Sequence, residues 1–152
     1  MVRISKLTDY GIVLLTHFAH NKTLTLTARD LSHNTKIPLP TVGKVLKLLS
    51  KTSILVSTRG ANGGYQLTRA PQDISLTDII SALEWPILMT SCGDGSHGDC
   101  EYETMCPTVS HWATISQTIQ RALGTLTLED MSAPFKRVNS KPPCLDQINT
   151  SL

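Results

Sequence analysis

Three of the four cysteines of this 152-residue chain, Cys92, Cys100 and Cys106, lie within one short segment. The segment reads SCGDGSHGDCEYETMC, so glycine, acidic and small polar residues separate the thiols. This composition is typical of a loop, and the thiols are therefore not expected to be buried in a core. Where thiols stay reduced, clustered cysteines bind metal more often than they pair as disulfides. The spacing predicts a metal centre.

Two kinds of centre use thiolate ligands, and the spacing bears on the choice between them. Structural zinc sites usually contain C-x2-C pairs, and this segment has none. Seven residues separate the first two cysteines and five the last two. Wider spacing in a glycine-rich loop can fold three thiolates around something larger than one ion, which favours an iron–sulfur cluster. Zinc stays open on spacing alone, and His97 could serve such a site.

The charge of the chain is divided between its two halves. Residues 1–70 carry ten Lys or Arg against two acids, whereas residues 71–152 carry four against ten, for a net charge of +2. A basic first half is expected of a surface that meets phosphate groups.

Hydrophobic periodicity predicts helices in this basic half. Apolar residues recur every three or four positions from Thr8 to about Asn21, with Thr8 or Asp9 as the N-cap. The sequence TLTLT at 23–27 alternates as a strand does. Thr27 then suits the N-cap of a second helix, from Ala28 to about Asn34.

A third predicted helix has one apolar face and one basic face. Pro40 suits its first turn. The apolar face comprises Val42, Val45, Leu46 and Leu49, and the opposite face Lys44, Lys47 and Lys51. Lysines of this kind can neutralise phosphates, and Thr41 is short enough to approach a base edge. Gly43 costs about 1 kcal/mol relative to alanine inside a helix, which either reflects close approach of the backbone to DNA or local tolerance.

A β-hairpin is expected directly after this helix. The β-prone runs LVSTR and YQLTR flank the glycine-rich turn GANGG, with Arg59 at the tip. An arginine on a hairpin tip can enter a narrow minor groove. The order of three helices and a hairpin predicts a mostly α fold with a small β-wing, a winged helix-turn-helix.

The rest of the chain predicts two further helices. One is capped by Ser75, with Ile74 and Ile79 in staple positions, and runs to about Leu83. The other, from about residue 107 to residue 124, has an apolar seam that favours pairing with a second chain over folding back on its own domain. The expected divisions are a DNA-binding domain (1–84), a cysteine loop (85–106), a dimerisation helix region (107–130) and a flexible tail (131–152), which contains Cys144.

Residues 1–130 resemble the IscR/NsrR family of winged-helix iron–sulfur transcription regulators. The matching pieces are RISKLTDYG, DLSHNTKIPLPTVGKVLKLL, RGANGGYQL, DISLTDIISALE and the three-cysteine loop. Members that regulate the SUF iron–sulfur assembly system begin in a similar way, with RISKLTDYG.

The resemblance implies roles for particular residues. Cys92, Cys100 and Cys106 match the cluster ligands, and Arg59 matches the wing arginine. The IscR branch has its histidine ligand where this chain has Val109, two residues before His111. The NsrR branch uses an N-terminal aspartate of the other subunit, to which Asp9 corresponds. The partner subunit's Asp9 is therefore the first candidate for the fourth ligand and His111 the second, and both [2Fe-2S] and [4Fe-4S] remain open.

Together these features predict a cytoplasmic homodimer without membrane contact that binds a roughly palindromic operator in double-stranded DNA. The resemblance implies a repressor that senses iron–sulfur status or oxidative stress and controls SUF genes. Two alternatives are a winged-helix regulator with a zinc or thiol-redox site, and an iron–sulfur carrier that does not bind DNA. The chain is not expected to be an enzyme, since it lacks a nucleophile–base pair in a recognisable setting and a phosphate-binding loop.

Overall fold

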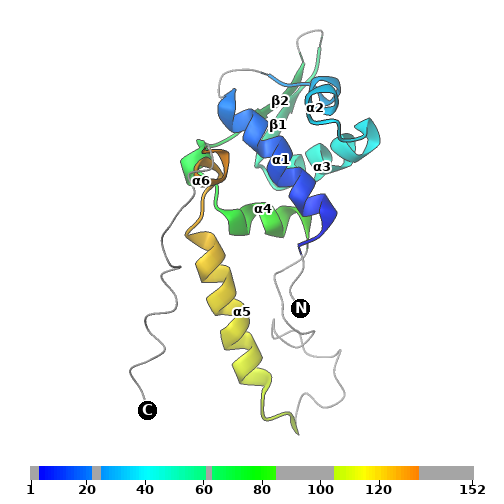
Figure 1. Ribbon diagram of the computed structural model, residues 1–152. Helices are drawn as coiled ribbons and strands as arrows, with labels where there is room; N and C mark the ends of the chain where they lie inside the picture. The colour runs from blue at the N-terminus through cyan, green and yellow to red at the C-terminus, as the bar shows by residue number, and fades with distance from the viewer. Residues whose placement is uncertain (1–3, 22–24, 61–62, 85–104, 134–152) are drawn as a thin grey trace.

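A computed structural model of the chain describes residues 4–21, 25–60, 63–84 and 105–133 (Figure 1). The described part is mostly helical, with one two-stranded antiparallel sheet. The elements in chain order are α1 (Lys6–His20), α2 (Ala28–Thr35), α3 (Leu39–Lys51), β1 (Leu55–Thr58), β2 (Gly64–Leu67), the 3-10 helix η1 (Pro71–Asp73), α4 (Leu76–Leu83), α5 (Val109–Gly124) and α6 (Leu128–Ser132). Each helix in this part lacks either the length or the apolar character needed to cross a membrane.

The hydrophobic core lies between α1, α3, α4 and α6. The predicted apolar face of α3 is completely buried there, which confirms that interpretation of its periodicity. Helix α1 approaches α4 closely at Gly11, where a Cβ atom would collide with the side chain of Leu83. The core side chains include Leu14, Leu15, Phe18, Val42, Val45, Leu46, Leu49, Ile74, Ile79 and Leu128.

The first helix begins earlier than the sequence predicts. Its N-cap is Ser5, whose hydroxyl accepts a hydrogen bond from the backbone N–H of Thr8 at 3.3 Å. Thr8 is therefore inside the helix and fully buried, and the expectation that Thr8 or Asp9 caps it is wrong. Ser5 lies three residues before Thr8, so its hydroxyl can accept the hydrogen bond of the Thr8 N–H, one of the unpaired N–H groups in the first turn. Neither Thr8 nor Asp9 has a side chain placed to accept that bond.

The predicted hairpin forms the wing. Strands β1 and β2 pair in the register Leu55↔Leu67 to Thr58↔Gly64. Of the predicted strand at 23–27, residues 23 and 24 lie outside the described residues, and Leu26 makes only an isolated bridge to Tyr65. At Gly64 a Cβ atom would lie 2.8 Å from the carbonyl oxygen of Leu26, so glycine is required where this segment crosses the wing.

A short helix near the C-terminal end completes the core. Thr127 and Asp130 form a capping box for α6, and Leu128 is fully buried. Backbone hydrogen bonds of 2.8 Å join Leu76 N–H to the Leu126 carbonyl and Leu128 N–H to the Ile74 carbonyl. Residues 126–132 thus pack against the winged-helix core, beside α1 and η1. Helix α6 was not predicted, because five residues are too few to show helical periodicity.

Candidate nucleic-acid interface and metal ligands

Helices α2 and α3 form a helix-turn-helix with a well-defined turn. The predicted N-cap Thr27 is confirmed, and with Asp30 it makes a capping box for α2. The C-cap of α2 is Lys36, which adopts a left-handed backbone with φ of 62°. The hydroxyl of Ser32 donates to the Ile37 carbonyl at 2.7 Å, and Ile37 is buried. The turn is therefore fixed on both sides, and it orients α3.

The outward face of α3 is a row of cations. Lys44, Lys47 and Lys51 are all exposed, opposite the fully buried face of the same helix. Pro40 lies in the first turn, as predicted, and Thr41 is half-buried there, with its N–H bonded to the Pro38 carbonyl at 2.9 Å. The α3 basic face, defined here as Lys44, Lys47 and Lys51, can neutralise phosphates along one side of a duplex.

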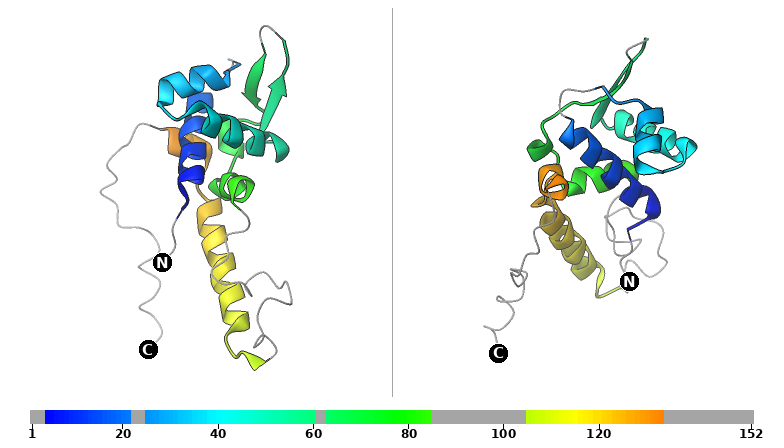
Figure 2. Two further views of the ribbon diagram at one scale, coloured as in Figure 1. Left: turned by 90° about the vertical axis from the view of Figure 1, so that its right-hand side faces the viewer. Right: turned by 45° about the horizontal axis from the view of Figure 1, so that its top comes forward.

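The wing carries the predicted arginine at its end. Arg59 follows β1 directly and is exposed. Strand β2 of the wing is held by two backbone hydrogen bonds between Leu26 and Tyr65, of 3.0 and 2.9 Å, and by one of 2.6 Å from Gln66 Nε2 to Thr25 Oγ1. The wing, α2 and α3 lie at the end of the molecule away from α5 (Figure 2). One end of the fold therefore presents both groups of cations.

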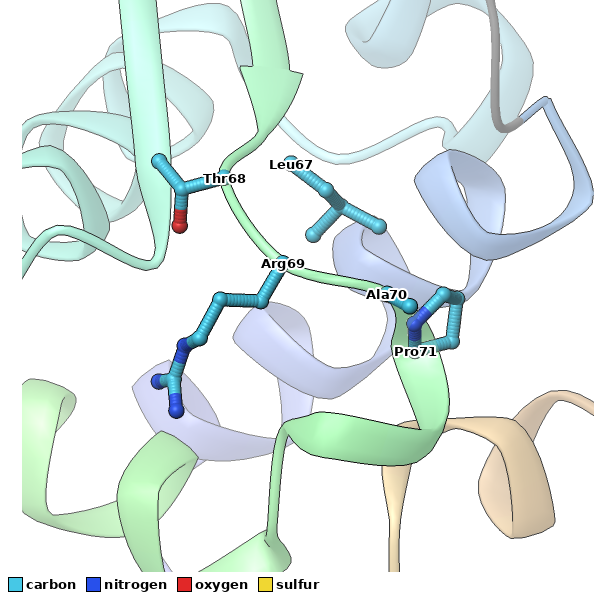
Figure 3. Close-up of a pocket in the computed structure, with 5 residues that line it drawn as sticks. All are labelled: Leu67, Thr68, Arg69, Ala70 and Pro71. Atoms are coloured by element: carbon cyan, nitrogen blue, oxygen red, sulfur yellow. The ribbon is translucent and has the colours of Figure 1, made fainter.

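An open cavity of about 300 Å³ lies beneath the wing, lined by Leu67, Thr68, Arg69, Ala70 and Pro71 (Figure 3). The Arg69 side chain extends away from Leu67 and Pro71. Its guanidinium donates to the Asp73 carbonyl at 3.1 Å and lies 3.6 Å from the Asp78 carboxylate. The partly exposed ion pair contributes little to stability. It directs the Arg69 guanidinium toward α4, so this side chain is not one of the cations that the wing presents.

The candidate metal ligands are only partly described. Cys106 precedes α5, is half-buried, and its Sγ lies 3.2 Å from Thr108 Oγ1. Cys92, Cys100 and Cys144 lie outside the described residues. Asp9 is exposed in the first turn of α1, and His111 is exposed near the start of α5. Within the described ranges the structure brings no three potential ligands together.

Glu84 is a site residue that sequence reasoning missed. It is the C-cap of α4 and immediately precedes the segment that contains Cys92. Its Oε1 accepts hydrogen bonds from Ser5 N–H at 2.9 Å and from the Thr8 hydroxyl at 2.6 Å. Glu84 therefore ties the start of α1, the helix that carries Asp9, to the point where the cysteine segment begins. A contact between positions so far apart in sequence has no local signal.

The Glu84 contact should be visible in the pH dependence of stability. Hydrogen bonds from Ser5, and then from Thr8, hold the pKa of Glu84 below its ordinary value of 4.5. Because the folded pKa is the lower one, the contact stabilises the protein above pH 4.5, and this contribution is lost as the pH falls through the folded pKa. Glu84→Gln is expected to reduce the unfolding free energy by about 1 kcal/mol at pH 7.

The measurement is denaturant unfolding of the wild type and Glu84→Gln from pH 3 to pH 7 at one protein concentration. Asp30 and Asp130 also have pKa values lowered, chiefly by side-chain hydrogen bonds from their capping threonines, Thr27 and Thr127. Their contributions are common to both proteins, so the difference between the two curves isolates Glu84. A difference that stayed constant across this pH range would contradict the assignment.

Helix α5 projects from the body of the molecule (Figure 1). It is joined to α4 by a hydrogen bond of 2.9 Å from the Thr77 hydroxyl to the Gln120 carbonyl. Ile115 is 40% exposed, Trp112 and Ile119 are half-buried, and Leu126, just past the helix, is 42% exposed. Much of the predicted apolar seam is thus left uncovered by the described residues of the same chain.

Comparisons with known proteins agree with this arrangement. "Protein rrf2" of Nitratidesulfovibrio vulgaris is 28% identical over 131 residues, which span 86% of this chain and 87% of that protein. The "HTH-type transcriptional regulator IscR" of Vibrio cholerae is 27% identical over 131 residues, 86% of this chain and 75% of that protein.

Two solved structures are also similar. The global cysteine regulator CymR of B. subtilis has a TM-score of 0.67 at 25% identity, covering 87% of this chain and 97% of that one. T. potens IscR has a TM-score of 0.64 at 26% identity, covering 86% and 85%. The relatives named here include transcriptional regulators, so the expectation of a non-enzymatic, winged-helix regulator is confirmed. The sequence profile of one family, described as "Iron-dependent Transcriptional regulator", matches residues 4–134, and the chain belongs to that family, Rrf2.

Proposed function

We propose that this transcriptional regulator is a homodimer that binds a roughly palindromic operator and represses transcription according to the state of an iron–sulfur cluster. The observation that carries the DNA-binding part is that α3, with its exposed basic face, and the wing, with its exposed Arg59, lie at the same end of the molecule. Lysines on α3 would contact phosphates, while Thr41 and Arg59 would approach the bases from the major and minor grooves.

Dimerisation is supported by the apolar surface of α5. Ile115 and Leu126 are about two-fifths exposed, and α5 projects from the body, where a second copy of the helix could cover them. A two-fold dimer would present two α3 helices and two wings, so the operator would contain two related half-sites.

The donor set fits an iron–sulfur cluster in its chemistry. Cys92, Cys100 and Cys106 would supply thiolates, the ligands that such clusters use. Asp9 is exposed in the first turn of α1, so a partner chain could use it as the fourth ligand, with the exposed His111 as the alternative. The bound cluster would supply a group whose ligation changes with iron supply and oxidation.

Glu84 and Asp9 would link the cysteine segment to the DNA-binding end. Asp9 is on α1, and Glu84 holds the start of the same helix. If the partner subunit's Asp9 is the fourth ligand, the position of α1 would differ between the protein with a bound cluster and the protein without one. This difference would shift the population of the conformation that binds DNA. If the Asp9→Ala variant kept both the cluster and the effect of the cluster on DNA affinity, Asp9 would not have this role.

Control of SUF genes is the most specific part of the proposal. It is supported by the resemblance of the N-terminal RISKLTDYG to regulators of that system. Binding to DNA upstream of SUF genes, compared with DNA upstream of other genes, would test it.

The first experiment is purification without oxygen, followed by the visible spectrum and the iron, sulfide and zinc content. We expect a brown protein with matched iron and sulfide. Cys106→Ala should remove the colour and the iron, whereas Cys144→Ala, a matched change in the tail, should retain both. A colourless wild type that holds zinc after reconstitution would leave a regulator with a zinc site. A brown protein that binds no DNA in a salt titration would instead be an iron–sulfur carrier.

A further inference from the structure

Gly43 in the middle of α3 has no role in folding that the structure reveals. Of the six glycines in the described residues, it is the one that combines an ordinary φ with open space, since no atom outside the neighbouring backbone of α3 lies within 4 Å of the place a Cβ would take. Gly60, by contrast, has φ of +119°, and at Gly11 and Gly64 a Cβ atom would collide with Leu83 and Leu26. Alanine would fit at position 43 without moving any described neighbour.

Alanine would also stabilise the helix at this position. Glycine inside a helix loses more backbone freedom on folding than any other residue, so it lowers helix stability. Helix α3 is otherwise built of residues with side chains, including the proline in its first turn. The described part of the chain therefore offers no packing reason for a glycine here, which favours a reason outside the chain over local tolerance.

The position of Gly43 on α3 indicates what that is. It precedes Lys44 directly and lies one helical turn before Lys47, so it borders the α3 basic face. Pro40 and Leu39, one turn earlier, are exposed. The missing side chain therefore leaves a notch in the outward face of the helix, flanked by cations that suit phosphates.

We propose that Gly43 is where the backbone of α3 comes nearest to the base edges in the major groove, so that glycine is required there for DNA recognition and not for folding. This rests on the proposed DNA-binding function. A recognition helix reads bases only if it enters the groove deeply. A side chain at the point of nearest approach would hold the helix out of the groove and weaken every neighbouring contact.

The test compares Gly43→Ala and Gly43→Leu with wild type. The probe is a duplex that the wild-type protein selects from a pool of random sequence, at one fixed salt concentration. Gly43→Ala is expected to raise Tm by about 3 °C and to weaken binding at least tenfold. Gly43→Leu, which also favours a helix, should weaken binding further because its side chain is larger.

Gly124→Ala is the matched control. Gly124 ends α5, and an added Cβ atom would lie 3.5 Å from Thr77 Oγ1, an ordinary contact. This variant adds the same methyl group to a helical glycine away from α3, and it should keep the wild-type affinity.

Three outcomes would overturn the proposal. Wild-type affinity in Gly43→Ala would show that DNA does not approach there. A fall in Tm would show that folding needs the glycine after all. A change of oligomeric state in size-exclusion chromatography would show that the notch receives protein. If the wild type selects no sequence from the pool, the DNA-binding function itself fails, which is distinct from equal binding by wild type and variant.

Discussion

Leu128→Ala is expected to lower the free energy of unfolding by about 3 kcal/mol, because it opens a cavity in the core. Leu128 is fully buried, and α6 packs against α1 and η1. The backbone bonds between residues 74–76 and 126–128 hold α6 in place, so the surrounding side chains can collapse only partly into the space. Denaturant unfolding at one protein concentration measures the change, since a dimer's stability depends on concentration.

Met131→Ala is the control for this prediction. Met131 belongs to the same helix but is 40% exposed, so its truncation should cost well under half as much. If the two variants lost the same free energy of unfolding, the buried side chain of Leu128 would not be the source of the stability that α6 provides.

Arg59→Ala is expected to weaken binding to the selected duplex about thirtyfold, or about 2 kcal/mol, and to reduce discrimination between that duplex and a scrambled one. The physical reason is that a guanidinium on the wing can enter a narrow minor groove, where the potential is most negative. Arg59 is exposed at the end of β1, and strand β2 of the wing is fixed by the bonds between Tyr65 and Leu26. Its loss should therefore leave the fold unchanged.

Lys47→Ala provides the contrast. Its ammonium is one of three on the α3 basic face, so its removal should weaken binding evenly across sequences and reduce the salt slope by about 1. Titrations at several salt concentrations, with selected and scrambled duplexes, separate the two effects. Wild-type protein that bound both duplexes equally would contradict both predictions.

Local patterns in the sequence were sufficient for the DNA-binding end of the fold. The three- and four-residue spacing of the apolar residues in α3 identified its buried face, and the predicted N-caps Thr27 and Ser75 located two helix starts. The glycine-rich turn between two β-prone runs identified the wing. Each of these signals lies within a few residues, so the sequence alone contains it.

Contacts between distant parts of the chain could not be predicted in this way. Glu84 bonds to Ser5 and Thr8 across about half of the chain, and Leu128 fills a core that is otherwise built from residues before position 84. Both contacts depend on how the helices pack; the capping box of Thr127 and Asp130 marks a helix start beside Leu128, but it does not indicate which core the leucine enters. The thiols Cys92 and Cys100 lie outside the described residues, so the predicted metal site rests on spacing and resemblance.

The late position of Leu128 has a consequence for biosynthesis. When a ribosome has made residues 1–84, the nascent chain has all of α1 to α4 but not the leucine that completes their core. The winged helix therefore reaches its full stability only after the cysteine segment and α5 have also emerged. The order of synthesis thereby places the predicted ligand cysteines outside the ribosome before the DNA-binding unit reaches its full stability.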